Sequence, residues 1–142
     1  LGDFVDKEGN YIGRHKGIIH YTIGQRRGLG IPAASRLYVC EISPKTNTVV
    51  LGDNADLFSS ELEADSVNLI SVDNLSEPKR VTAKIRYRHK EQPATAWQTP
   101  DGILHVKFDE PQRAITKGQA VVMYDGDEVV GGGVINKIYS QS

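Results

Sequence analysis

The sequence has little of what builds disulfide-rich, metal-thiolate or membrane-spanning proteins. Cys40 is its one cysteine, so neither an intrachain disulfide nor a multi-thiolate metal site can form, and a reduced cytoplasm is the simplest setting. No apolar run approaches the roughly 18 residues of a membrane helix, and the first residues have neither part of a signal peptide. The chain does not begin with Met, which suggests a piece of a longer protein. We therefore expect a soluble, cytoplasmic protein with no membrane partner.

Recognisable catalytic machinery is missing as well. The glycine-rich segment 17–30 lacks the Gly-Lys-Ser/Thr ending of an NTPase phosphate loop. His15 and His20 have no third ligand at a suitable spacing, so packing or RNA contact is a better interpretation than metal binding. Cys40 lies in the apolar segment 37–42, which favours a buried thiol over a nucleophile. The sequence thus predicts no catalytic residue, no metal site and no cofactor within this chain.

Charge is strongly segregated, although the formal net charge is only -1. Residues 9–40 contain five Lys or Arg, residues 78–90 contain six, and neither window contains an acid. The two windows therefore hold eleven of the 17 basic residues and none of the 18 acidic ones. Two basic surfaces on an acidic body favour a polyanion such as RNA as the partner. Chance clusters of solvated surface residues are the alternative.

Glycine and proline are frequent, and the segments between them are short and rich in Val, Ile and Tyr, which predicts a mainly β fold. The first part should contain strands at 3–6, 11–14, 37–43 and 48–52, at most one helical turn within 19–23, and a short helix at 54–57. Further strands are expected at 66–71, 80–89, 94–98, 103–108, 120–124 and 128–139, a spacing typical of a small barrel or sandwich. Glycines 131–133 predict a bulge or a close approach of two backbones. We place the domains at 1–62 and 63–142.

The segment 81–90 is the most informative one. Because side chains alternate along a strand, it should direct Val81, Ala83, Ile85 and Tyr87 to one face and Lys84, Arg86, Arg88 and Lys90 to the other. The cations would then lie about 6.6 to 6.8 Å apart, which resembles the spacing of successive phosphates in RNA. Protection of a free sheet edge is the alternative explanation for such a row. Four cations with Tyr87 beside them favour RNA binding.

Arg26 and Arg27 form a second candidate site. They lie in the glycine-flanked loop 17–30, where exposed amides and guanidinium groups can bind phosphates through bidentate hydrogen bonds. We include both arginines among the candidate RNA-binding residues.

These residues also suggest a family. Segments 9–17 and 21–30, with Tyr-Thr-Ile-Gly-Gln-Arg-Arg-Gly-Leu-Gly, resemble the central domain of bacterial-type tRNA-specific 2-thiouridylases. Segments 84–88, 108–112, 117–120, 124–127 and 131–133 resemble the carboxy-terminal barrel of that family. The resemblance runs in order over nearly the whole chain. Lys117 departs from the family pattern, because the family often has Pro there. It implies a small β-rich central domain followed by a six-stranded β-barrel similar to the second domain of elongation factor Tu.

The resemblance further implies the tRNA-binding part of an enzyme that uses ATP and magnesium to adenylate the wobble uridine of tRNA. The enzyme then replaces the uridine oxygen with sulfur from a persulfide donor protein. Its adenylating domain and two catalytic cysteines would lie upstream of Leu1, so this chain alone would be inactive. Arg86, Tyr87 and Gln119 would correspond to tRNA-contacting positions, and Lys84, Arg88, Arg26 and Arg27 complete the predicted tRNA-binding set. The alternatives are a free-standing β-barrel RNA-binding or translation-factor module, and a protein-interaction domain with incidental charge.

Overall fold

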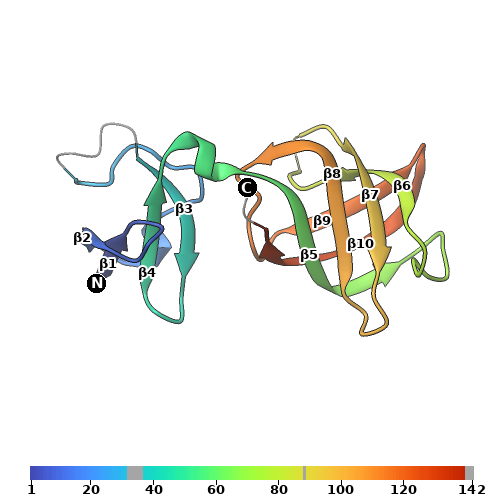
Figure 1. The fold of residues 1–142 in the computed structure, drawn as a ribbon, viewed down its shortest axis with the longest axis horizontal. Coiled ribbons are helices and arrows are strands. Elements are labelled where there is room, and N and C mark those ends of the chain that lie inside the picture. The colour runs from blue at the N-terminus through green and yellow to red at the C-terminus, as the bar shows by residue number, and fades with distance from the viewer. Residues whose placement is uncertain (32–36, 88, 140–142) are drawn as a thin grey trace. The chain divides into compact units, whose positions relative to one another are not determined.

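The computed structural model describes residues 1–31, 37–87 and 89–139, which form two compact units, Leu1–Phe58 and Ser59–Ser142 (Figure 1). Each unit has its own hydrophobic core. The chain is mainly β, as the sequence predicts, and the two short helices within the described residues are single 3-10 turns. None of the helices in the described residues is long and apolar enough to span a membrane.

The first unit is a four-stranded sheet in the order β2-β1-β4-β3. Its elements are β1 (Gly2–Val5), β2 (Tyr11–His15), η1 (Ile18–His20), β3 (Tyr38–Ser43), β4 (Thr48–Gly52) and η2 (Asn54–Leu57). β1 pairs antiparallel with β2 and parallel with β4, so the amino-terminal strand lies in the middle of the sheet. Phe4, Val39 and Val49 are fully buried at the centre of the core.

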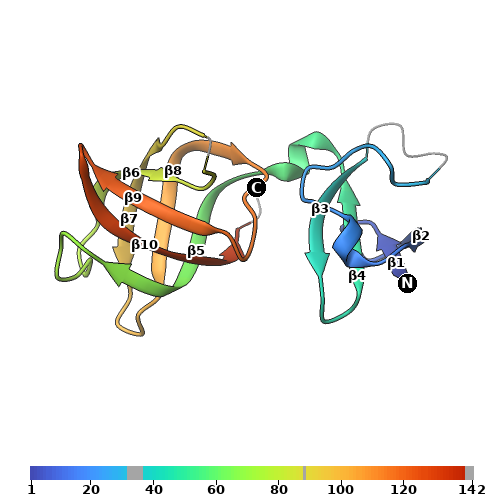
Figure 2. The same ribbon diagram turned by 180° about the vertical axis from the view of Figure 1, so that it is seen from behind.

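The second unit is a closed six-stranded antiparallel barrel in the order β10-β5-β8-β7-β6-β9 (Figures 1 and 2). Its strands are β5 (Phe58–Leu69), β6 (Lys79–Lys84), β7 (Gln92–Gln98), β8 (Leu104–Arg113), β9 (Ala120–Asp125) and β10 (Glu128–Ile138). Alternate residues point into the barrel, and Leu62, Leu104 and Ile135 are fully buried there. The expected six-stranded barrel is confirmed, and the sandwich is excluded because β10 pairs with both β5 and β9.

The three consecutive glycines of β10 lie where three strands approach closely. A Cβ atom on Gly131 would lie 2.4 Å from the carbonyl oxygen of Asn68, and one on Gly132 would lie 2.2 Å from that of Val121. The pairing register of β10 shifts at Val129/Gly131 with β9 and at Gly132/Val134 with β5. Both the bulge and the close backbone approach that the sequence predicts are present.

Two expected strands have different bounds in the structure. The first barrel strand begins at Phe58 and not at Ser66, and it pairs with β10 from Leu62 onward. The compact units accordingly divide between Phe58 and Ser59, four residues before the expected boundary at residue 62. Residues 59–62 belong to the barrel because Tyr139 is hydrogen-bonded both to Ser59 and to the backbone of Glu61. The expected strand over residues 80–89 also ends earlier, as described below.

Candidate nucleic-acid interface

The basic segment after β6 is a turn and not a continued strand. β6 ends at Lys84 because its pairing with β7 stops at Ala83 and its pairing with β9 stops at Lys84. The next residues bend back, and the backbone N–H of His89 donates to the carbonyl of Arg86 at 3.2 Å. The predicted row of four evenly spaced cations on one strand face is therefore wrong beyond Lys84. The predicted alternation holds up to Ile85, since Val81, Ala83 and Ile85 are 5%, 1% and 9% exposed.

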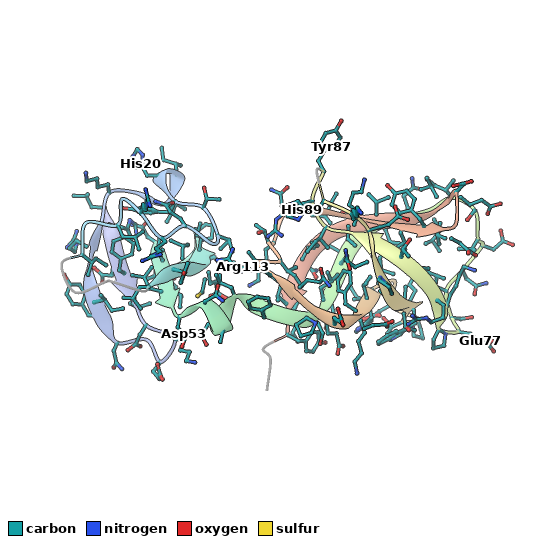
Figure 3. The ribbon with its side chains drawn as sticks, turned by 90° about the horizontal axis from the view of Figure 1, so that it is seen from above. His20, Asp53, Glu77, Tyr87, His89 and Arg113 are labelled. Carbon is teal, nitrogen blue, oxygen red and sulfur yellow. The ribbon has the colours of Figure 1, made fainter. Side chains whose placement is uncertain are left out.

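Tyr87 lies in this turn with 91% of its surface exposed. It projects away from the barrel, whereas His89 lies nearer the barrel wall (Figure 3). A regular strand would have placed Tyr87 on the buried face with Ile85, so the end of β6 is what exposes the ring. An aromatic ring held out in water beside cationic groups is a typical platform for stacking of an unpaired base.

Arg86 is half-buried and fixed to the barrel. Its guanidinium donates to the carbonyl of Ala114, a non-glycine residue with φ of +58°, and the hydroxyl of Thr116 donates to the same oxygen at 3.0 Å. Burial lowers the pKa of the Arg86 guanidinium, and the positive charge of Arg113 acts in the same direction. Arg86 thus connects the turn after β6 to the loop that precedes β9.

Gln119 is the last residue of that loop, and its side chain is exposed. Its backbone is fixed on both sides, because its N–H donates to Thr116 and its carbonyl accepts from Ile135 at 2.9 Å. The structure therefore links the loop of Gln119 to Arg86 through Ala114 and Thr116.

Two further candidates belong to the segment 81–90. The Nζ atom of Lys84 lies 5.9 Å from the ring centroid of Tyr124, in a cation–π contact. Arg88 lies outside the described residues.

Arg26 and Arg27 are exposed in the loop of the first unit. Gln25 holds this loop in place, since its side chain accepts from the backbone of Thr22 at 3.0 Å and donates to the carbonyl of Arg27 at 2.8 Å. Its backbone also pairs with Val39 of β3 at 2.8 Å. The two arginines are thereby presented by an ordered loop, in a different unit from Arg86 and Tyr87.

His15 has a structural role, whereas His20 is exposed at the end of η1. His15 is 1% exposed, and its Nδ1 accepts from the backbone of Gly17, so Nε2 carries the proton and donates to the carbonyl of Asn47 at 2.8 Å. Its ring packs against Phe4 and Tyr21, with centroids 5.6 and 5.7 Å away. Within residues 1–31, 37–87 and 89–139, no group of three or more His, Cys, Asp or Glu side chains is arranged to hold a metal ion.

Beside the turn after β6, the barrel has a pocket of about 120 Å³ that the sequence did not indicate. Its floor is apolar and its rim is polar; the lining residues are Ala83, Ile85, Arg86, His89, Lys90, Gln92 and Gln112. Gln92 begins β7 and faces Ala83 of β6, while Gln112 lies near the end of β8, the other neighbour of β7. The pairing of β6, β7 and β8 thus brings these residues to the turn.

Comparison with known proteins agrees with this architecture. The family of aminomethyltransferase β-barrel domains matches residues 59–135, and the family of tRNA methyl transferase PRC-barrel domains matches residues 1–53. The tRNA-specific 2-thiouridylase MnmA of Clostridioides difficile is 60% identical over 136 residues, which are 96% of this chain and 38% of that protein. The enzymes of the same name from Acetivibrio thermocellus and Clostridium acetobutylicum are 57% and 54% identical, each over 94% of this chain.

The chain spans 37 to 38% of the length of these relatives. The two matched domains follow one another in the order and at the positions of the two compact units. The chain belongs to the tRNA-specific 2-thiouridylase family.

Proposed function

We propose that this chain is the tRNA-binding part of a tRNA-uridine 2-sulfurtransferase, and that the turn after β6 binds tRNA. The observation that carries the proposal is Tyr87, which is 91% exposed between Arg86 and the other basic groups of the turn. Exposing a large aromatic ring to water has no benefit for folding, whereas base stacking on such a ring contributes about 1 to 3 kcal/mol per base.

The distribution of ion pairs supports the same surface. At the start of β6, Lys79 pairs with Asp125 at 2.9 Å and Arg80 pairs with Asp109 at 2.7 Å. In the described part of the chain, Lys84, Arg86 and Lys90 make no such pair with an acid. The positive charges of these three residues are therefore not balanced by ion pairs, and they favour a polyanion.

The closed barrel argues against the alternative that these cations protect a free sheet edge. β6 pairs with β7 on one side and with β9 on the other, so it has no unpaired edge to protect. The basic residues at its end therefore need another explanation, and RNA binding supplies one.

Family membership supports the wider proposal. The whole enzyme would be cytoplasmic, would use ATP and magnesium to adenylate the wobble uridine, and would receive sulfur from a persulfide donor protein. An adenylating domain outside this chain would bind these groups. The chain itself would contribute tRNA binding through Arg86, Tyr87, Arg88, Gln119 and Lys84, with Arg26 and Arg27 as a second contact, and no catalysis.

The test is tRNA binding by the 142-residue chain, measured by fluorescence anisotropy at fixed salt. Tyr87→Ala should weaken binding by about 1 to 3 kcal/mol, which is roughly five- to 150-fold, because a stacked base is lost. Tyr87→Phe keeps the ring and should bind like the wild type. Tyr11→Ala removes another exposed tyrosine, 63% exposed in the first unit, and serves as the matched control. Wild-type affinity in Tyr87→Ala would contradict the proposal.

A further inference from the structure

The pocket beside the turn after β6 has features of a small anion site. Ala83 and Ile85 close its floor, since they are only 1% and 9% exposed. Its other lining residues are two cationic residues, one histidine and two glutamines, namely Arg86, Lys90, His89, Gln92 and Gln112. Among the described residues, no Asp or Glu lines it. The nearby carboxylate of Glu91 is turned to the hydroxyl of Thr82, from which it accepts at 2.8 Å.

The pocket is small. Its volume of about 120 Å³ has room for a phosphate group, which consists of one phosphorus and four oxygens. The base belonging to the same nucleotide would stay outside, where Tyr87 is exposed.

The donors around the pocket suit a phosphate. Arg86 uses part of its guanidinium on Ala114, and a guanidinium has five N–H donors in all. The amide of Gln112 donates to the carbonyl of Glu110 at 3.0 Å, which fixes its position and leaves its second N–H for another acceptor. Burial lowers the pKa of the Arg86 guanidinium, and repulsion from the positive charge of Arg113 lowers it further. An anion bound beside Arg86 would relieve that repulsion.

We propose that this pocket binds one backbone phosphate of tRNA, at an unpaired nucleotide whose base stacks on Tyr87. The inference rests on the proposed function and makes it more specific: the ligand is a single-stranded nucleotide held at two points, and Lys90, Gln92, His89 and Gln112 join the tRNA-binding residues. A regular duplex does not satisfy both contacts, because its bases are stacked on one another and cannot cover Tyr87.

The experiment is phosphate-ethylation interference on a tRNA transcript, in which ethylnitrosourea converts single phosphates into neutral triesters. The test variant combines Lys90→Ala with Gln112→Ala. Arg86 is left in place because its removal would also disturb Ala114. The matched control combines Lys107→Ala with Gln98→Ala, which removes one lysine and one glutamine from barrel strands outside the pocket. The urea unfolding midpoint of each variant shows whether it is folded, and Lys90→Ala alone, at an exposed position, replaces the double variant if the latter unfolds.

With wild type and control, ethylation at one particular phosphate should prevent binding. With the pocket variant, interference at that phosphate should disappear while other positions remain unchanged, and the slope of log affinity against log salt should fall by about 0.7, the value for one single-strand contact. An unchanged interference pattern in a folded pocket variant overturns the inference. Perturbation of the His89 imidazole signals by inorganic phosphate, with an unchanged tRNA pattern, also overturns it, because the pocket then takes only the free ion. Absence of any tRNA binding by the wild type would instead refute the proposed function.

Discussion

His15 and Cys40 of the first unit serve packing. His15 satisfies both ring nitrogens, one with the backbone N–H of Gly17 and one with the carbonyl of Asn47, and this allows an imidazole to lie in an otherwise apolar core. Cys40 is half-buried on β3, and its thiol donates weakly to the carbonyl of Tyr38 at 3.5 Å. Burial raises the pKa of the Cys40 thiol to about 11, and the carboxylates of Asp56 and Asp53 act in the same direction.

Cys40 should therefore be unreactive in the folded chain. Raising the pKa of the thiol from 9.0 to about 11 lowers the thiolate fraction at pH 8 about 100-fold. Iodoacetamide should therefore alkylate Cys40 about 100 times more slowly in the folded chain than in the chain unfolded in concentrated urea. In the folded chain, the rate should keep rising through pH 9 towards pH 11. Because the chain has one cysteine, labelling measured by mass spectrometry reports this site alone. A rate that levels off near pH 9 in the folded chain would contradict the raised pKa.

At the scale of elements, the sequence predicts the features that depend on side-chain alternation within a strand. It misses the features that depend on how neighbouring strands pair. Val81, Ala83 and Ile85 are buried as their period of two requires. The end of β6 is set by where β7 and β9 stop pairing with it. The exposure of Tyr87 depends on that end, and the pocket depends on the pairing of β7 with β8, which carries Gln112, so neither was predictable from the pattern of residues 81–90 alone. The glycines of β10 were predictable because only glycine tolerates such close backbones.

Gly132 gives an element-scale prediction. Gly132→Ala places a Cβ atom 2.2 Å from the backbone oxygen of Val121, and β9 cannot move away without breaking its pairing with β10. We expect a loss of about 3 kcal/mol in the free energy of unfolding, at the upper end of the usual overpacking cost. The control is Gly126→Ala. Gly126 has a φ of +60°, but no atom lies within 4 Å of an added Cβ. The expected cost is therefore the left-handed backbone conformation alone, about 1 to 2 kcal/mol. Urea unfolding followed by the fluorescence of Trp97, the one tryptophan, reports the barrel. Equal losses in the two variants would show that β9 and β10 can separate at little cost.

At the scale of the whole molecule, the two units differ in how their sheets end. The first has β2 and β3 at the edges of a four-stranded sheet, while the second closes on itself and leaves no strand unpaired. Each has a separate core cluster, with Phe4 and Leu51 in one and Leu62 and Met123 in the other. A unit with its own core and a closed sheet has what independent folding requires.

The barrel should therefore fold alone, provided that it begins at the right residue. A fragment of residues 58–142 keeps all of β5, including the fully buried Leu62 and the 2.5 Å hydrogen bond from Ser59 to the carbonyl of Tyr139. A fragment of residues 63–142, which starts at the boundary expected from the sequence, loses both. Removal of a buried leucine side chain costs about 2 to 5 kcal/mol, a large part of the roughly 5 to 15 kcal/mol that stabilises a typical domain.

We expect residues 58–142 to unfold cooperatively in urea, with the Trp97 transition at the midpoint that the barrel has in the full chain. Residues 63–142 should unfold at a much lower urea concentration or be unfolded in buffer, because the loss of Leu62 is added to the loss of the backbone pairing between Glu61 and Tyr139. Coincident transitions by fluorescence and far-ultraviolet circular dichroism establish that each fragment unfolds in two states. Equal midpoints for the two fragments would show that the first five residues of β5 contribute nothing to the barrel, and the domain boundary would then lie at residue 62.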